Sequence, residues 1–309
     1  GAFRGFTDAP DPVLEASPLS MFDTLRAVIR GKTPAQMRLK GRIWQWQRGD
    51  TVAGTDPVVV FAMPLVSRRR SDNWEEVCAN LARTLDSLRR QSSHRWAVIL
   101  CGQDAPDGIT LPDNVEFVRF TGSDRYFDKG LKRRAIVRHL LRSRRDEGYL
   151  FQFDADDIAH PDLVRHIVED HNAAGYFLPE GYLWNIATGE VAPLAERKGL
   201  KALNRICGSS NAVHFDLRRN RASGAVLNEM KAHAAIPARM EYFGLHMQPV
   251  PFPAALYVIG HGENMIGRRG KLGGKLDYIA RHALPASEAQ TVLRAFGVDA
   301  AEIAPARAP

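Results

Sequence analysis

The run Tyr149-Leu150-Phe151-Gln152-Phe153-Asp154-Ala155-Asp156-Asp157 determines how this chain is interpreted. Its mostly apolar first half predicts a buried strand, and the acidic tetrad (residues 154–157) follows directly. Carboxylates this close together repel one another, so a folded chain tolerates them most easily when a cation lies among their oxygens. Mg²⁺ and Mn²⁺ prefer such ligands. We therefore predict a metal site at the carboxyl end of a sheet, with Asp154 and Asp156 as ligands and Asp157 in support.

Three alternative roles for the acidic tetrad fit the sequence less well. A calcium loop of the EF-hand type beginning at Asp154 requires Gly at its sixth position and Glu at its twelfth, where this chain has Ala159 and Arg165. A phosphatase of the haloacid dehalogenase type usually has Thr or Val where Ile158 stands, and its acidic motif normally follows the first strand. A strand end whose carboxylates only cap the helix near Pro161 needs one Asp rather than three.

The composition is that of a globular protein with a mild basic excess. The 309 residues include 45% hydrophobic and 25% charged residues, and 42 Lys and Arg against 35 Asp and Glu give a net charge of +7. This charge suits anionic partners without choosing among phosphates, nucleic acid and an anionic membrane face. The three cysteines form no CxxC pair, and no apolar run approaches the length of a membrane span. We expect buried thiols and a cytoplasmic protein.

Apolar runs alternate with amphipathic stretches from Pro57 onward. The pattern predicts strands over residues 57–63, 95–101, 115–120, 149–153, 181–184, 205–215 and 254–259. It predicts helices that begin near Asp72 with a capping box to Glu75, over 129–145, from Pro161 and over 288–296. The 129–145 helix is expected to bury Leu131 and to expose Arg133. The fold class is therefore α/β, a mostly parallel central sheet with helices on both faces.

Several ordered motifs resemble those of nucleotide-sugar-dependent glycosyltransferases with the GT-A fold. The Asp-x-Asp motif at 154–156, followed by His160-Pro161-Asp162, is similar to their metal motif and the helix start after it. Ala62-Met63-Pro64 is similar to the start of their nucleotide loop, and residues 84–92 resemble a run found in family-2-like members. The resemblance covers about residues 57–170. It implies a Rossmann-like fold and Mn²⁺- or Mg²⁺-dependent sugar transfer from a nucleotide-diphosphate donor to a glycan or glycolipid, with no nucleic acid partner.

The resemblance also implies further binding residues. A His near the end of the catalytic core often contacts the metal or a phosphate in such enzymes. His261 between two glycines is in that place, and we expect it to complete the metal site with Asp154 and Asp156. The basic segment that follows contains Arg268 and Lys271, which we expect near the diphosphate. Other expected donor contacts come from the first loop (residues 67–70 after Pro64), from the segment 124–133 that opens a helix, and from the acidic tetrad. The principal ones are Pro64, Arg68, Asp128, Lys129, Lys132 and Asp154.

The identity of a general base for the acceptor hydroxyl stays open. Glu229 and Asp216 are the principal candidates, and Glu241 and His233 are alternatives. The chain lacks the plain Glu-Asp pair often seen at this place in family-2-like enzymes, so inverting and retaining chemistry both remain open. A phosphohydrolase and a non-catalytic anion- or nucleic-acid-binding module are the competing functions.

We divide the chain into an N-terminal helical extension (1–55), a nucleotide-sugar-binding half (56–172), an acceptor-binding half with a basic loop (173–284) and a tail (285–309). Helices are expected in the extension over 21–29 and 34–46. The second combines Trp44 and Trp46 with basic residues. It suits either peripheral contact with the inner face of a membrane or a helix clamped to the main domain by its tryptophans.

Overall fold

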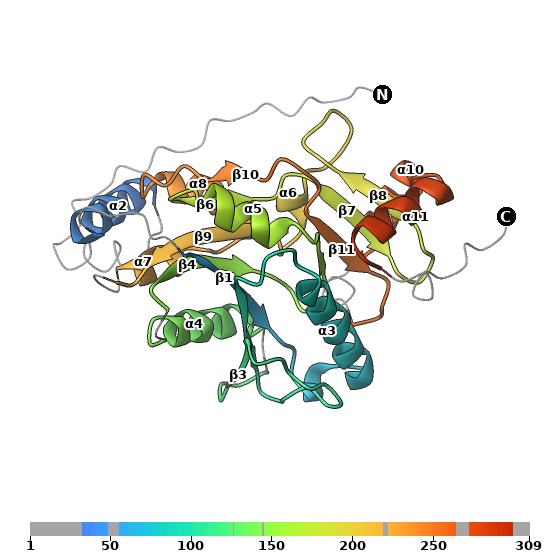
Figure 1. The fold of residues 1–309 in the computed structure, drawn as a ribbon, viewed down its shortest axis with the longest axis horizontal. Helices are drawn as coiled ribbons and strands as arrows, with labels where there is room; N and C mark the ends of the chain where they lie inside the picture. The colour runs from blue at the N-terminus through green and yellow to red at the C-terminus, as the bar shows by residue number, and fades with distance from the viewer. Residues whose placement is uncertain are drawn as a thin grey trace, which may run out of the picture.

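A central mixed sheet organises the molecule (Figure 1). The computed structural model describes residues 33–48, 56–125, 127–143, 145–218, 222–263 and 272–298. Within these ranges seven strands form the sheet, in the order β10 (Gln248–Pro249), β6 (Gly175–Phe177), β9 (Asn211–Asp216), β4 (Glu147–Gln152), β1 (Val58–Pro64), β2 (Trp96–Gly102) and β3 (Val115–Arg119). All of them run in one direction except β9, which is antiparallel to β4 and β6. The predicted mostly parallel sheet is confirmed.

Side chains that alternate along the strands supply both faces of this sheet. In β1, Val59, Phe61 and Met63 enter one core cluster, whereas Val60 and Ala62 enter another. The first cluster is covered by α3 (Trp74–Arg89) and α5 (Leu163–Asp170). The second is covered by α4 (Lys129–Leu140), α7 (Ser223–Leu227), α8 (Ile236–Glu241) and α2 (Pro34–Arg48). Helices therefore lie on both faces, as the fold class requires.

A smaller sheet extends the molecule beyond the acidic tetrad. Its strands are β5 (Ile158–Ala159), β11 (Ala255–Ile259), β7 (Gly181–Asn185) and β8 (Val191–Leu194), in that order. It lies to one side of the large sheet together with α10 (Gly273–His282) and α11 (Ala286–Ala295) (Figure 1). Because β5 begins directly after Asp157 and pairs with β11, the tetrad lies where the two sheets meet.

Helix α2 is the described part of the N-terminal extension, and it packs on the α7–α8 side of the large sheet. Met37, Gly41 and Trp44 are buried, and the Trp44 ring meets the edge of Phe243 at a centroid distance of 5.8 Å. A Cβ at Gly41 would lie only 1.7 Å from the carbonyl oxygen of Tyr242, so only glycine permits this approach. The helix expected over 21–29 lies outside the described residues.

The prediction for the helix beginning at 129 was wrong in its length and for Leu131, whereas Leu140, also predicted on the inner face, is buried. The helix ends at Leu140, and Leu131 is 49% exposed. The buried face instead carries Lys132, which is 1% exposed because its ammonium donates to the carbonyl oxygen of Leu65 at 2.7 Å and pairs with Asp128 at 2.9 Å. These two polar contacts fix the rotation of the helix, which periodicity of apolar residues alone did not indicate.

Three local predictions also need correction. The strand expected over 205–215 begins only at Asn211, because α6 (Leu203–Ile206) precedes it. The cap of α3 is Asn73, whose side chain accepts from the backbone N–H of Glu76, rather than Asp72. Helix α5 begins at Leu163, two residues later than Pro161.

The large sheet takes strands from both sides of residue 172, because β6, β9 and β10 follow that residue and the other four strands precede it.

Two other predictions concern the cysteines and the membrane. Cys78, Cys101 and Cys207 are buried free thiols, as expected. In the described part of the chain, no helix combines the length and the apolar character that crossing a bilayer requires.

Candidate functional site

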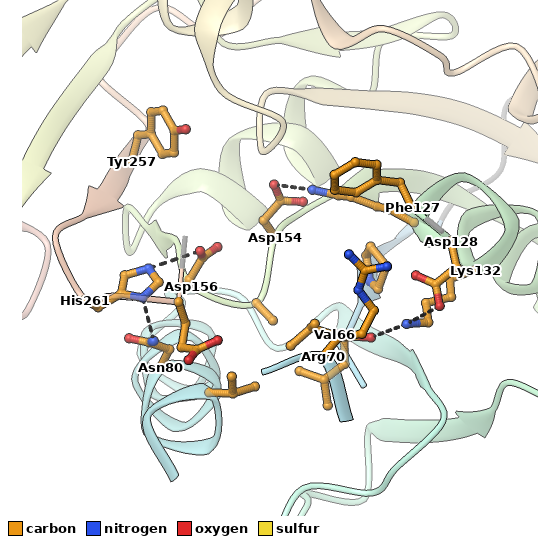
Figure 2. A pocket seen from close by; sticks show the side chains of 16 residues that line it. Val66, Arg70, Asn80, Phe127, Asp128, Lys132, Asp154, Asp156, Tyr257 and His261 are labelled. Carbon is orange, nitrogen blue, oxygen red and sulfur yellow. Dashed lines mark hydrogen bonds and ion pairs between the residues drawn. The ribbon is translucent and has the colours of Figure 1, made fainter. Parts of the chain in front are cut away.

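A pocket lies at the carboxyl ends of β1 and β4, beside the first turn of α4 (Figure 2). This is where open α/β sheets bind ligands. Its lining includes these residues predicted from the sequence: Pro64, Asp128, Lys129, Lys132, Asp154, Asp156 and His261. Arg70 and Phe127, which lie in the two segments expected to contact the donor, also line it. The lining further includes these residues that were not predicted as ligand contacts: Leu65, Val66, Val77, Asn80, Ala155, Tyr257 and Glu263.

Asp157 is the buried anchor of the acidic tetrad. Its carboxyl group accepts from the backbone N–H of Val258 at 3.1 Å and from Ser209 Oγ at 2.5 Å, and it is fully buried. Burial, reinforced by the neighbouring charges of Asp156 and Asp154, raises the pKa of Asp157 well above its usual range. Asp157 therefore joins the end of β4 to β11 and lies beneath the pocket rather than in its lining.

Asp154 faces two cations across the pocket. Its Oδ2 accepts from Lys129 Nζ at 2.7 Å, and its Oδ1 lies 3.6 Å from a guanidinium nitrogen of Arg133. Burial acts to raise the pKa of Asp154, but the charges of Lys129 and Arg133 outweigh it and hold the pKa below its usual value. Asp154 is therefore an ionised carboxylate in the pocket wall.

Asp156 is held by a chain of polar side chains that begins on α3. Arg83 donates to the amide oxygen of Asn80, which turns the Asn80 amide nitrogen toward His261 Nδ1 at 3.0 Å. His261 Nδ1 then acts as the acceptor, so Nε2 carries the proton and donates to Asp156 Oδ2 at 3.2 Å (Figure 2). In this hydrogen-bonded arrangement, His261 orients Asp156 instead of offering a lone pair to a metal.

The acidic oxygens fit a hard divalent cation. One oxygen from each of Asp154, Asp156 and Asp157 lies within 4.8 Å of the others. Asp154 Oδ1 is buried and has no hydrogen-bond donor among the described residues, which leaves one carboxylate oxygen for a ligand to satisfy. The donor set consists only of carboxylate oxygens, the kind of ligand that Mg²⁺ and Mn²⁺ prefer.

The remaining predicted donor contacts differ in position. Lys132 and Asp128 line the pocket but are committed to each other, and Asp128 also accepts from Gln103 at 2.7 Å. Arg68 lies outside the lining, where it pairs with Asp107. Arg70 takes its place in the pocket, with its guanidinium 5.5 Å from the ring centre of Phe127. Arg268 and Lys271 lie outside the described residues.

The structure separates the two principal candidates for the general base from the pocket. Asp216 ends β9 and pairs in register with Glu147 at the start of β4, the edge of the sheet opposite to Asp154. Glu229 is 2% exposed and is enclosed by ion pairs with Lys40 of α2, Lys231 and Arg239. Neither carboxylate lines the pocket, and the ion pairs of both are with residues outside its lining, so neither is retained below as a base.

Of the two alternative bases, Glu241 and His233, it is His233 that interacts with charged residues of the pocket. It begins the short helix η2 (His233–Ala235), and its ring interacts with the charges of Asp154, Lys129 and Arg133. Burial lowers the pKa of His233, although the Arg205 carbonyl and Asp154 act in the opposite direction. Its imidazole is therefore neutral near pH 7, the state in which it can accept a proton.

Asn80 is a pocket residue whose signal in the sequence was not used. It is a polar residue on the otherwise apolar face of α3, and a buried polar residue requires a partner. Gly208 lies close to Asp154: a Cβ at Gly208 would lie 2.9 Å from Asp154 Oδ2, so the close approach of this loop requires glycine.

Comparisons with known proteins are limited to the fold. No protein-family model and no curated protein matches the chain. A solved structure described as the crystal structure of 4-diphosphocytidyl-2C-methyl-D-erythritol synthase is similar over 73% of this chain and 99% of its own, with 14% identity and a TM-score of 0.36. A similarity of this extent says nothing about the reaction of this chain. The fold and pocket themselves define an α/β protein with a carboxylate-rich pocket at the ends of parallel strands.

Replacing Gly208 by Ala is expected to weaken metal binding without unfolding the protein. The new methyl group would displace the Asp154 carboxylate, so we expect Mn²⁺ affinity, measured by calorimetry, to fall by about tenfold or more, as for loss of a well-placed ligand contact. Gly130→Ala is the matched control, because a Cβ there meets nothing within 4 Å. Equal Mn²⁺ affinities in the two variants and the unmodified protein would contradict this interpretation.

Proposed function

We propose that this protein is a metal-dependent glycosyltransferase that moves a sugar from a nucleotide-diphosphate donor to a hydroxyl group of a glycan or glycolipid. The observation that carries the proposal is the meeting of carboxylates and cations in one pocket. Asp154 and Asp156 line it together with Lys129 and Arg70, and Arg133 lies 3.6 Å from Asp154. Carboxylates alone repel a diphosphate, whereas carboxylates that hold a cation, next to further cations, form a site that attracts one.

Asp154 and Asp156 are the proposed metal ligands, with His261 holding the orientation of Asp156. Bound Mn²⁺ or Mg²⁺ supplies positive charge to the diphosphate and so improves the nucleotide as a leaving group. Lys129 lies 2.7 Å from Asp154 and is placed to contact the same phosphates. Phe127, which is 53% exposed at the pocket, offers a ring face for stacking of the nucleotide base (Figure 2).

His233 is the proposed general base for the acceptor hydroxyl. It is the only one of the four candidates with an electrostatic link to Asp154 among its described interactions. Its neighbour Arg205 holds the ring through a backbone carbonyl 3.3 Å from Nε2, which leaves Nδ1 as the nitrogen that can receive a proton. This assignment replaces Glu229 and Asp216 in the proposed mechanism.

The competing functions have less support. A phosphohydrolase needs the same metal but no acceptor, and it is distinguished below by its products. A nucleic-acid-binding module leaves the carboxylates in the pocket unexplained. Two arginines of the segment around α4 also have carboxylate partners within the protein, which leaves fewer of them to bind nucleic acid. Arg133 faces Asp154, and Arg145 pairs with Glu116 at 2.7 Å.

Asp156→Asn is expected to abolish metal-dependent nucleotide binding. UDP, GDP, CMP and dTDP are tested by thermal shift with and without Mn²⁺, and we expect at least one to stabilise the unmodified protein only with the metal, because ligand binding to the native state raises its stability. Asp156→Asn should lose that stabilisation, since one ligand charge is removed. Asp216→Asn is the matched control at the opposite edge of the sheet and should retain it.

Two results would overturn the proposal. One is the absence of stabilisation by every nucleotide in both conditions. The other is release of inorganic phosphate from the bound nucleotide or its sugar ester without any acceptor, which is the product of a phosphohydrolase.

His233→Asn is expected to remove the acidic limb of the pH–rate profile. The lowered pKa of His233 means that the active, neutral imidazole persists below pH 6.5, and the rate should fall as pH drops through that pKa and the ring gains a proton. The variant should lose roughly 10²–10⁴-fold in kcat with unchanged nucleotide affinity. His246→Asn, which alters an 81% exposed ring, is the control. An unchanged pH profile in His233→Asn would eliminate this residue as the base.

Helix α2 supports peripheral contact with an anionic lipid surface, which is where a glycolipid acceptor would be found. Its outer face carries Leu39, Ile43 and Trp46, which are 42%, 41% and 83% exposed and follow helical spacing. Exposed Arg38 and Arg42 flank them. The inner face packs against the protein through Trp44. Trp44 therefore attaches the helix to the main domain, and Trp46 is the tryptophan proposed to contact the membrane.

Replacing Leu39, Ile43 and Trp46 together by Ser is expected to reduce binding to anionic vesicles while leaving the net charge unchanged. Loss of apolar burial should weaken partitioning by roughly tenfold or more, since about 25 cal/mol is lost for each Å² of apolar area withdrawn from the lipid. Vesicle sedimentation measures the effect, and thermal unfolding serves as the control for folding. Equal sedimentation of the variant and the unmodified protein would remove the lipid surface as a partner.

A further inference from the structure

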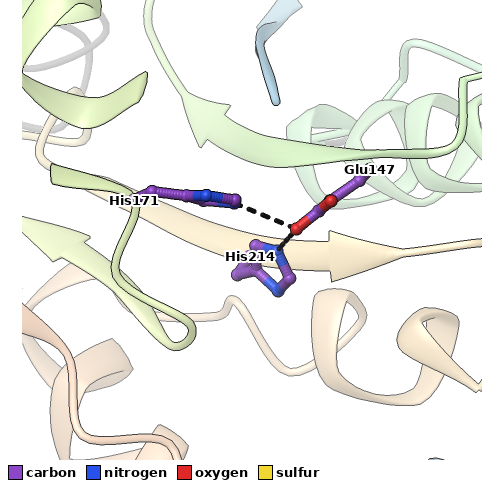
Figure 3. A group of neighbouring side chains, drawn as sticks. All are labelled: Glu147, His171 and His214. Carbon is purple, nitrogen blue, oxygen red and sulfur yellow. Dashed lines mark hydrogen bonds and ion pairs between the residues drawn. The ribbon is translucent and has the colours of Figure 1, made fainter. Parts of the chain in front are cut away.

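A second cluster of metal-ligating side chains lies away from the pocket, at the opposite end of β4 (Figure 3). It consists of Glu147, the first residue of β4, His214 of β9 and His171 directly after α5. The residues between Glu147 and Asp154 span roughly 20 Å of extended chain, so this cluster is separate from the acidic tetrad.

The three side chains converge on one carboxylate oxygen. Nε2 of His171 and Nε2 of His214 lie 3.0 and 2.9 Å from Glu147 Oε1, and Figure 3 shows both rings directed at it. In a tetrahedral zinc site, ligands about 2.0–2.2 Å from the metal are roughly 3.3 Å apart. The ligand atoms therefore need to separate by only about 0.4 Å to admit the ion, a shift that side-chain rotation supplies.

The protein holds these ligands in place through buried tyrosines. Tyr149 OH donates to the carbonyl oxygen of Asn172 at 2.9 Å, and Tyr176 OH donates to Asp170 at 2.5 Å. These contacts fix both neighbours of His171, whose backbone has the left-handed φ of 51°. A residue other than glycine pays a conformational cost in that region, and here the conformation directs the imidazole toward Glu147.

The second carboxylate oxygen of Glu147 has a different neighbour. Arg218 lies 3.4 Å from Oε2 but is bound more closely to Asp216, at 2.6 Å. Arg218 therefore neutralises one side of the carboxylate and leaves Oε1 to the imidazoles. Glu147 is 5% exposed, while the side chains of His171 and His214 are 19% and 14% exposed, so water reaches the two imidazoles.

We infer that Glu147, His171 and His214 form a zinc-binding site that ties β4, β9 and the end of α5 together. Two imidazoles and one carboxylate are a ligand set of zinc sites, with water as the fourth ligand. Imidazole ligands favour Zn²⁺ over Mg²⁺ or Mn²⁺, which the all-oxygen tetrad favours. The site does not depend on the function proposed for the pocket.

The test measures Zn²⁺ uptake by the full chain after metal removal, in competition with a chromophoric zinc indicator. We expect one tightly bound equivalent in the unmodified protein and a higher melting temperature with Zn²⁺. The double variant His171→Asn/His214→Gln should bind this equivalent at least roughly 100-fold more weakly, because it lacks two of three ligands. Asn tolerates the left-handed backbone of residue 171, and both amides keep a donor toward Glu147.

Two controls separate this site from others. His139→Gln removes an imidazole that pairs with a single carboxylate, Glu116, and should retain the tight equivalent. Asp156→Asn should also retain it, because it alters only the pocket. Co²⁺ substitution gives an independent readout, since four-coordinate Co²⁺ absorbs visible light and this absorption should be present in the control variants and absent in the double variant.

Three results would overturn the inference. They are no tight Zn²⁺ in the unmodified protein, equal uptake by the double variant, and loss of uptake in Asp156→Asn. If the double variant fails to fold, as judged by circular dichroism, His214→Gln alone decides the question, because it keeps the backbone of residue 171 and still removes one ligand.

Discussion

The burial of the Asp157 carboxyl group is the constraint on which the arrangement of the pocket depends. Asp157 accepts from Val258 of β11 and from Ser209, which itself accepts from the backbone N–H of Asp154. These contacts join the end of β4 to the smaller sheet and to the loop before β9. Because the third carboxyl group points inward, Asp154 and Asp156 are turned outward into the pocket, and the cost of burying Asp157 is offset by its hydrogen bonds.

The carboxylates of the pocket have polar partners before any ligand binds. Asp154 is paired with Lys129 and Arg133, and Asp156 accepts a hydrogen bond from His261. In the function proposed above, a divalent cation among the carboxylates would free Lys129 to contact a phosphate. The charged side chains would therefore have partners both with and without the bound ligand, so that no unpaired charge is left in a partly buried place.

Elements fixed by apolar burial could be predicted from the sequence, whereas those fixed by individual polar contacts could not. The parallel strands were predictable because burial on both faces leaves continuous apolar runs, and Asp154 and Asp156 were brought into one pocket because both follow such a run. The rotation of α4 was not predictable, since a buried lysine that bonds the carbonyl oxygen of Leu65 determines it. Asp216 was a candidate base because the sequence does not reveal the direction of the strand that carries it. β9 is antiparallel to β4, which carries Asp216 to the far edge.

That antiparallel pairing also explains why one sheet carries two different polar clusters. Residues at the start of β4 lie beside the end of β9, so Glu147 meets His214 there, while the end of β4 carries the acidic tetrad. The ligand atoms differ at the two ends, with imidazole nitrogens at one and only carboxylate oxygens at the other. Metal preference follows ligand type, so the two metal sites proposed above would select different ions and would not compete for one. If β9 ran parallel to β4, its carboxyl end would lie beside Gln152 instead of Glu147, and His214 would not reach Glu147. In the described sheet, β9 is the neighbour of β4 that runs antiparallel to it, and this pairing creates the second cluster.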